Sequence, residues 1–294
     1  MNRKRETLIG YLFLAPALIV FLMLVAFPVV MSLGLAFTKW NFFSGWGKLE
    51  FVGIDNFVKL FTRDRSFKTA LVNTLLYTVT TVPLSIFMAL ILAYVLTGKV
   101  YGKRFFRVAF FIPYISNMVA LGAVFKFLFR SEGPVNSLLT GVLGLDGMPQ
   151  WLSSPNLSRV PIICVMVYAG IGFCLIIYIA ALKNVPRELY EAAAIDGASQ
   201  VRQFFDITIP LISPATIYLT VVRMIAAFQV FAPINIITSG GKSSGSVSLV
   251  VLIYEEAFKN YNFGYASAES WILVVFILGV TLLQFLYQKK WVHY

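Results

Sequence analysis

The chain has 294 residues, of which 59% are hydrophobic and 13% are charged. Soluble domains carry about 25% charged residues, so this composition excludes a soluble domain with a hydrated surface. We therefore predict an all-α integral membrane protein with several helical spans. The net charge of +11 comes from short basic clusters beside apolar runs, a placement that is typical of membrane orientation and excludes a nucleic-acid-binding face.

Six apolar runs reach the length of about 20 residues that a membrane-spanning helix needs. We predict one transmembrane domain over 1–294, with spans at residues 8–33, 70–97, 108–129, 161–182, 208–237 and 270–288. The first run follows a basic start, as in a signal peptide, but it exceeds the apolar core of about 7–15 residues found there. We therefore predict an uncleaved span. Pro83, in the middle of the second span, predicts a kink.

Cysteine, histidine and glutamate are rare in and around the spans. Cys164 and Cys174 would lie ~15 Å apart along one helix, too far for a disulfide, so we predict that they pack in the interior. His293 is the only histidine, so we expect no metal site. The run 247–258 contains Glu255 and Glu256 and is too short to span, which predicts an interfacial helix.

The placement of Lys and Arg predicts which side of the membrane each loop faces. Six spans put both termini on one side, and the two sides carry similar numbers of basic residues. On one side these residues adjoin the spans, whereas most on the other side fall in one long loop, so we predict cytoplasmic termini. The cytoplasmic set is Arg3, Lys4, Arg5, Lys99, Lys103, Arg104, Arg107, Lys183, Arg187, Arg202, Lys289 and Lys290, and the outer set is Lys39, Lys48, Lys59, Arg63, Arg65, Lys68, Arg130, Arg159, Lys242 and Lys259.

The most polar stretch in the second half of the chain is residues 186–210, between the fourth and fifth predicted spans. It lies on the predicted cytoplasmic side. Pro186 suits the first turn of a helix, Gly197 is expected to end that helix, and Ser199 can cap a second one. The stretch is therefore either a docking elbow for a soluble partner or a solvated loop.

Within this stretch, Glu191-Ala-Ala, Gly197 and Ile207-x-Ile209-Pro210 resemble the EAA motif of ABC importer permeases, although that motif has Leu at the position of Ile209. Other segments are similar to the carbohydrate-uptake branch of these permeases, among them FVGIDNFVKLF, FFRVAFFIPYISNMVA and TSGGK. The beginning of the chain resembles the MalF/UgpA-type subunit, and the resemblance covers nearly the whole chain.

This resemblance implies the fold of a type I ABC importer permease, which forms half of a translocation pathway for sugars and is not an enzyme. It implies that Glu191 pairs with a basic residue of a separate ATPase and that Gly197 provides the turn between two coupling helices. The residues implied to couple to the ATPase are Glu191, Ala192, Ala193, Gly197, Ile207, Ile209 and Pro210.

The same resemblance implies the partners and the compartment. The partners would be a second homologous permease, a cytoplasmic ATPase dimer, an extracytoplasmic sugar-binding protein, the carbohydrate and membrane lipid, in a bacterial plasma (inner) membrane. We expect no cofactor on this chain, because ATP and Mg²⁺ would occupy the ATPase. In agreement, the sequence contains no Gly-x-x-x-x-Gly-Lys-[Ser/Thr] loop.

Polar and aromatic residues in the spans are candidates for the substrate pathway, because sugars bind to aromatic faces and hydrogen-bonding groups. For Asn117 and Gln229, the alternative role is hydrogen bonding between helices. For Arg223, the alternative role is packing against a partner subunit. The candidates are Tyr114, Asn117, Tyr168, Arg223, Gln229 and Asn235. Four outer aromatic residues are expected either to meet the sugar-binding protein or to form an interfacial belt: Trp40, Phe42, Phe43 and Trp46.

Two other classes of membrane protein fit the sequence less well. A secondary transporter driven by an ion gradient would need carboxylates within the membrane, and the six predicted spans contain none. A membrane-embedded enzyme would need a buried histidine, a carboxylate pair or a cysteine nucleophile, and no such set is evident in the spans. The ion-gradient transporter is kept as the alternative.

Overall fold

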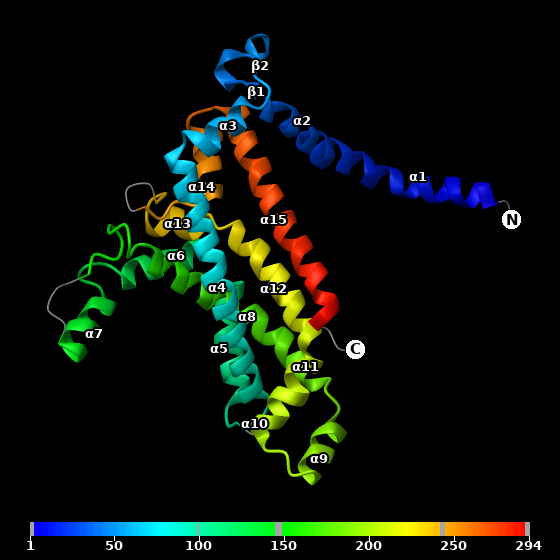
Figure 1. Ribbon diagram of the computed structural model, residues 1–294, viewed down its shortest axis with the longest axis vertical. Helices are drawn as coiled ribbons and strands as arrows, with labels where there is room; N and C mark the ends of the chain where they lie inside the picture. The colour runs from blue at the N-terminus through cyan, green and yellow to red at the C-terminus, as the bar shows by residue number, and fades with distance from the viewer. Residues whose placement is uncertain (1–2, 99, 145–148, 242–244, 292–294) are drawn as a thin grey trace. The chain divides into compact units, whose positions relative to one another are not determined.

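The computed structural model describes residues 3–98, 100–144, 149–241 and 245–291. Lys99, Lys242 and His293, which enter the predictions above, lie outside the described residues. The described chain is mostly helical (Figure 1), which confirms the predicted fold class. Its helices include four that are long and apolar enough to cross a membrane, or up to six if each of two bent helix pairs is counted as one span.

The chain divides into two compact units. Unit 1 comprises Met1–Asp64 and Ile253–Val274, and unit 2 comprises Arg65–Leu252 and Val275–Tyr294. Two helices, α14 (Leu249–Tyr254) and α15 (Phe263–Trp291), contribute residues to both units.

Unit 1 begins with a long apolar helical segment. It consists of α1 (Arg3–Phe21), η1 (Leu22–Ala26) and α2 (Phe27–Ala36). Residues Ile9–Ala36 form a candidate membrane span in which none of the apolar window is buried, as expected of a helix that is apolar on every side. This candidate span overlaps the predicted span 8–33 and ends three residues later.

A small cap follows this segment in unit 1. Strand β1 (Thr38–Lys39) pairs antiparallel with β2 (Glu50–Phe51). The buried side chain of Asn56 fixes the cap, because its amide donates to the carbonyl oxygens of Ala36 and Thr38, both at 2.9 Å. The short helices of this part are η2 (Phe42–Ser44), η3 (Trp46–Lys48), α3 (Asp55–Thr62) and η5 (Glu255–Lys259).

Two long helices, α4 (Arg65–Thr97) and α8 (Arg159–Lys183), form the centre of unit 2 and pack along each other. Ala89 and Ala93 of α4 are fully buried in the core that they share, since small side chains let membrane helices approach closely. Cys174 of α8 is buried in the same core and both cysteines are free thiols. The two helices cover the predicted spans 70–97 and 161–182.

The other helices of unit 2 are shorter. They are α5 (Lys103–Ile115), α6 (Met118–Leu128), α7 (Pro134–Leu143), α9 (Arg187–Ile195), α10 (Gln200–Gln203), η4 (Phe204–Thr208), α11 (Ile209–Leu211), α12 (Ser213–Phe228) and α13 (Ala232–Ile237).

The predicted third span, 108–129, is not one straight helix. Helices α5 and α6 meet at an angle of 102°. Ser116 has an extended backbone, and the side-chain oxygen of Asn117 accepts a hydrogen bond from the Val119 amide at 2.8 Å. Asparagine is a favoured residue at helix starts, so this side chain begins a second helix where the hydrophobicity pattern predicts continuation.

The predicted fifth span, 208–237, is also interrupted. The axis bends by 64° between 200–211 and 213–228, and the helix stops again after Phe228. The next three residues are not helical before α13 begins. The Val230 carbonyl in this gap accepts a hydrogen bond from the buried Ser248 hydroxyl at 2.7 Å, so a side chain distant in sequence supports the break.

Three further segments bear on the sequence predictions. Helix α4 contains Pro83 without a break in the helix, and the kink at this proline stays a prediction. Helix α15 begins seven residues before the predicted start of the last span at residue 270, so that the fully buried Glu269 lies within it. Helix α14 forms within the predicted run 247–258, and its Leu249 and Val251 are buried. Its place at the membrane interface stays a prediction.

Helix α4 holds the segment that connects α13 to α14. The Asn73 amide donates to the carbonyl oxygens of Gly245 and Val247, both at 2.8 Å. The Tyr77 hydroxyl donates to the carbonyl oxygen of Ser246, also at 2.8 Å. All of these groups are buried or partly buried, so each bond satisfies a backbone carbonyl that lies outside the helices.

Replacing Asn73 by Ala should therefore destabilise unit 2. The variant leaves the buried Val247 carbonyl without the Asn73 donor, at a cost of about 1–3 kcal/mol, and leaves the Gly245 carbonyl with only the Arg159 guanidinium at 3.5 Å. We expect a lower midpoint of thermal unfolding for Asn73→Ala in detergent than for the control Val72→Ala, whose side chain is 59% exposed in the parent. Equal midpoints for the two variants would contradict this assignment.

Candidate functional site

The stretch 186–210 forms two short helices joined at a glycine, as the sequence predicts. Helix α9 ends in a turn where Gly197 has a positive φ of 76°, a conformation that favours glycine. The Ser199 side chain then caps α10 by accepting a hydrogen bond from the Arg202 amide at 3.3 Å. We call the segment from α9 to α11 the elbow.

The tip of the elbow is exposed and partly apolar. Ile195 is 87% exposed and Val201 is 67% exposed, on either side of the Gly197 turn. Glu191 and Ala192 are also exposed, and Glu191 forms no ion pair with any basic residue that the structure describes. Exposed apolar groups beside an unpaired carboxylate are typical of a surface that meets another protein.

The base of the elbow is anchored to the helices of unit 2. The hydroxyl groups of Tyr190 on α9 and Thr208 on η4 are hydrogen bonded at 2.8 Å, and Thr208 is fully buried. The rings of Tyr94 on α4 and Phe204 on η4 are in edge contact, with centroids 4.8 Å apart. The remaining motif residues are half-buried, namely Ala193 on α9 and Ile207, Ile209 and Pro210 at the base. The motif therefore has an exposed first half and an anchored second half.

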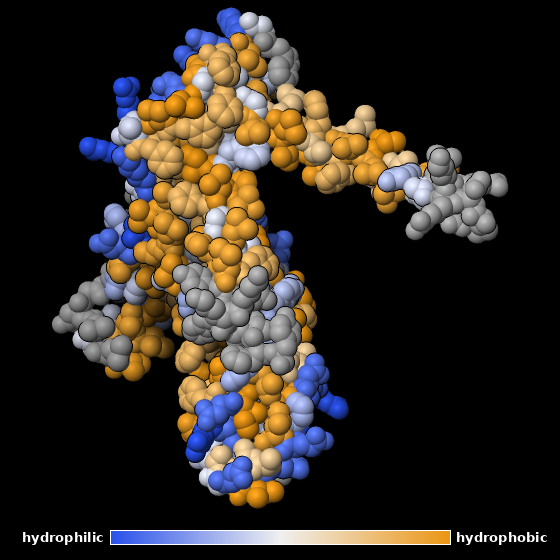
Figure 2. All heavy atoms as spheres, turned by 45° about the vertical axis from the view of Figure 1, so that its right-hand side comes forward, coloured by the Kyte–Doolittle hydropathy of each residue, from blue (hydrophilic) through white to orange (hydrophobic). Residues whose placement is uncertain are grey.

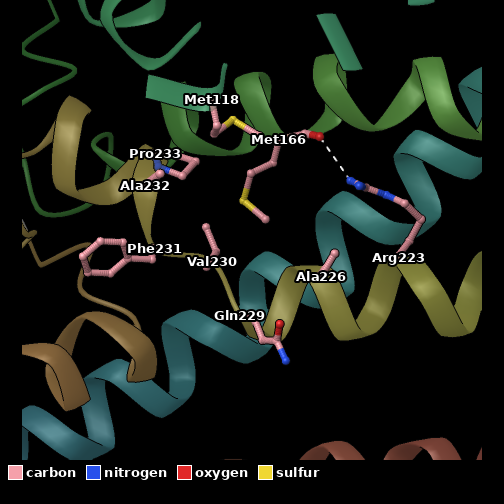
Figure 3. Close-up of a pocket in the computed structure, with 9 residues that line it drawn as sticks. All are labelled: Met118, Met166, Arg223, Ala226, Gln229, Val230, Phe231, Ala232 and Pro233. Carbon is pink, nitrogen blue, oxygen red and sulfur yellow. Dashed lines mark hydrogen bonds between the residues drawn. The ribbon is translucent and has the colours of Figure 1, made fainter. Parts of the chain in front are cut away.

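A pocket lies at the far end of α12 from the elbow (Figure 3). Its volume is about 320 Å³, and α6, α8, α12 and the gap before α13 contribute to it. Arg223 and Gln229 are the two predicted pathway residues that it brings together. Its lining consists of Met118, Met166, Arg223, Ala226, Gln229, Val230, Phe231, Ala232 and Pro233.

Arg223 is held in a notch of α8. Its Nη2 donates to the Met166 carbonyl oxygen at 3.2 Å, and Figure 3 shows the guanidinium turned toward that oxygen. A side chain at Gly170 would collide with it, since an added Cβ would lie 2.6 Å from Cζ. Nε is buried and unpartnered among the described groups, so Arg223 keeps hydrogen-bonding capacity beside the pocket.

The other predicted pathway residues do not line this pocket. The Asn117 side-chain oxygen is used in capping α6, and Asn235 is exposed on α13. Tyr168 lies against Phe125, with ring centroids 5.9 Å apart. Tyr114 belongs to an aromatic row with Phe111, Phe173 and Tyr218 across α5, α8 and α12.

Residues that the sequence analysis missed are the apolar lining groups and Gly170. Met118, Met166 and Phe231 are unremarkable in an apolar run, so no pattern separates them from lipid-facing residues. A glycine inside a span marks close approach of another element, and this signal could have identified Gly170. Among the described residues, no three His, Cys, Asp or Glu side chains form a group that could hold a metal ion.

The outer aromatic residues of unit 1 divide into two sets. Trp40 is buried, and its indole N–H donates to the Gly45 carbonyl oxygen at 3.1 Å. Phe42 and Phe43 are exposed, and the Phe43 ring contacts that of Tyr261 with centroids 4.4 Å apart. The side chain of Trp46 lies outside the described residues.

Comparison with known proteins gives consistent results. A family model described as "Binding-protein-dependent transport system inner membrane component" matches residues 65–293. The lactose transport system permease protein LacF of Rhizobium radiobacter is 35% identical over 94% of this chain and 92% of its own length. The sn-glycerol-3-phosphate transport system permease protein UgpA of Agrobacterium fabrum is 31% identical, over 98% and 97% respectively.

A solved structure extends this likeness to the fold. A chain in the crystal structure of a bacterial alginate ABC transporter, in complex with an alginate pentasaccharide-bound periplasmic protein, matches with a TM-score of 0.80. It is 26% identical, and the match covers 98% of this chain and 96% of that one. These findings confirm the resemblance to ABC importer permeases. The chain belongs to the family of inner-membrane components of binding-protein-dependent transport systems.

Proposed function

We propose that this chain is the permease subunit of an ATP-driven importer for sugars, either oligosaccharides or related carbohydrates. It forms half of the translocation pathway and couples to a separate ATPase through its elbow. The single observation that carries the coupling role is the elbow itself, with an exposed tip and an anchored base. The names of two relatives support the carbohydrate class, since one transports lactose and the other belongs to an alginate transporter.

The coupling role follows from the two halves of the elbow. Glu191 and the apolar residues around Gly197 offer a partner an acidic group beside a small apolar surface. The base is fixed through the hydrogen bond of Thr208. Helix α12 follows the base directly, with its axis at 64° to that of residues 200–211. A displacement of the tip by an ATPase is therefore passed to α12 instead of being absorbed in a flexible loop.

The orientation and the partners form part of the same proposal. In unit 2, Lys103, Arg104, Arg107, Lys183 and Arg187 lie at the ends of helices that meet near the elbow. Figure 2 shows hydrophilic side chains gathered at this end, below a broad hydrophobic zone. Since basic residues favour the cytoplasmic side, the elbow and both termini face the cytoplasm of a bacterial cell.

The remaining components follow from the same arrangement. ATP and Mg²⁺ bind to a cytoplasmic ATPase dimer, and this chain binds neither. A second homologous permease completes the pathway, and an extracytoplasmic sugar-binding protein delivers the sugar, with the exposed Phe42 and Phe43 as candidates for its docking surface. In the pathway, the pocket beside Arg223 and the aromatic row with Tyr114 offer the donors and ring faces that sugars use. Asn117, Tyr168, Gln229 and Asn235 stay candidates for the pathway.

The ion-gradient alternative gains no support. One difference between the predicted and the observed helices bears on this alternative. Helix α15 starts earlier than predicted and so includes the carboxylate of Glu269 within a candidate span. A single buried carboxylate does not make an ion pathway, and the family to which the chain belongs works with a binding protein.

Replacing Glu191 should uncouple the transporter. We expect Glu191→Gln to lower sugar uptake at least about tenfold in cells that carry the whole transporter, because a charge pair at an interface is lost. Membrane levels of the chain, measured on immunoblots, should not change. The matched control is Glu188→Gln, which removes an exposed carboxylate from the same helix. Equal uptake by the two variants would refute the role of Glu191.

The absence of ATPase activity in this chain is directly measurable. The purified chain in lipid nanodiscs should release no phosphate from ATP, and activity should appear when a sister permease and the ATPase dimer are added. A glutamate substitution in the catalytic site of the ATPase serves as the control. Phosphate release by the purified chain alone would contradict the proposal.

The notch that holds Arg223 can be tested by a double-mutant cycle. Gly170→Ala should lower stability by about 1–3 kcal/mol, because the added methyl group overpacks against the guanidinium. In an Arg223→Ala background the same change should cost little, and the difference is the coupling between the two sites. Thermal unfolding of the four proteins measures it. Additive effects would mean that Arg223 points elsewhere, as toward a partner subunit.

A further inference from the structure

A second cavity lies at the end of unit 2 that carries the elbow. Its volume is about 580 Å³, and its walls come from the last turns of α4 and α8 and from α9 and α10. Its lining does not include Glu191, Ile195 or Val201, so these exposed residues of the tip stay free for a partner. Its lining consists of Tyr94, Val95, Thr97, Gly98, Leu182, Lys183, Val185, Arg187, Tyr190, Gln200 and Gln203.

The lining of this cavity, which we call the basal cavity, is positively charged. Lys183 and Arg187 supply two cations, and the lining contains no acidic residue. Neither cation forms an ion pair with a carboxylate that the structure describes. Hydroxyl and amide groups such as those of Thr97 and Gln200 complete the walls. Two cations among several donors suit a compact anion with several oxygen atoms, such as a phosphate group.

The level of the basal cavity relative to the membrane indicates the source of such a phosphate group. Helices α4 and α8 are both candidate membrane spans, and the cavity is built on their ends, at Thr97 and Lys183. Helix ends of this kind lie at the level of lipid headgroups. At the rim, Tyr94 is 39% exposed and Val95 is 48% exposed, so an apolar surface on which an acyl chain can lie adjoins the cationic walls.

We propose that the basal cavity binds the phosphate headgroup of an anionic phospholipid. A soluble anion would use only the cationic walls, whereas a phospholipid uses both these walls and the apolar rim. Assignment to the cytoplasmic leaflet rests on the proposed orientation, but the site itself depends on neither the orientation nor the transported sugar. A bound headgroup contacts α9 and α10 as well as α4 and α8, so it braces the elbow against the membrane helices.

The site can be tested on the full-length chain in detergent by native mass spectrometry with added phosphatidylglycerol. We expect Lys183→Gln/Arg187→Gln to weaken lipid binding about 25-fold, because each basic residue near a lipid headgroup contributes a factor of about five. The matched control is Lys103→Gln/Arg104→Gln, which removes the same charge near the same end of unit 2. All four residues are exposed, but Lys103 and Arg104 do not line the cavity. It should change the affinity less than about threefold. The charge-conserving variant Lys183→Arg/Arg187→Lys should retain binding, which separates loss of charge from loss of fold.

Two competitors distinguish the possible ligands. Phosphatidylcholine at the same concentration should not displace the bound phosphatidylglycerol, and millimolar inorganic phosphate should displace it only weakly. Equal loss of lipid in the two neutralised variants would overturn the proposal, since surface charge alone would then explain binding. Full displacement by inorganic phosphate would likewise overturn the lipid as ligand and leave a site for a soluble anion.

Discussion

A backbone N–H or C=O group that leaves the helical ladder inside a membrane must find its partner within the protein, because lipid offers none. This constraint explains how unit 2 tolerates its interruptions. The Asn117 side chain accepts from the first turn of α6, and the Ser248 hydroxyl satisfies the carbonyl freed at Val230. Asn73 and Tyr77 of α4 do the same for the connection to α14. The breaks, and the pocket that one of them opens, depend on these few polar side chains.

The same constraint separates what could be predicted from the sequence from what could not. The long helices α4 and α8 follow from charge-free apolar runs, and the elbow follows from the local signals of Pro186, Gly197 and Ser199. The break after Phe228 could not be predicted, because its neighbours are equally apolar and its support comes from Ser248, 18 residues from Val230. The periodicity of a sequence describes only local structure and cannot identify a hydrogen-bond partner so far along the chain.

The candidate site shows the same division. The exposed first half of the motif could be predicted because its polarity contrasts with the spans around it. Of the six pathway candidates, only Arg223 and Gln229 line the pocket, since the bends that gather the lining are set by tertiary contacts. Helix α12 joins the two regions, beginning at Ser213 beside the elbow and ending at Phe228 beside the pocket. Its 16 residues extend over ~24 Å, so one continuous helix connects the elbow with the pocket.

The seat of Arg223 against Gly170 has a consequence for how sequences in this family can diverge. The guanidinium occupies the volume that any larger residue at position 170 would need. A side chain at 170 therefore requires the Arg223 guanidinium to leave this position or a shorter residue to replace it. The two positions, 53 apart in the chain, should change as a pair across homologues, because co-variation follows spatial contact. A substitution of Arg223 on α12, which changes the charge of the pocket, should then be accompanied by substitutions at position 170 on α8.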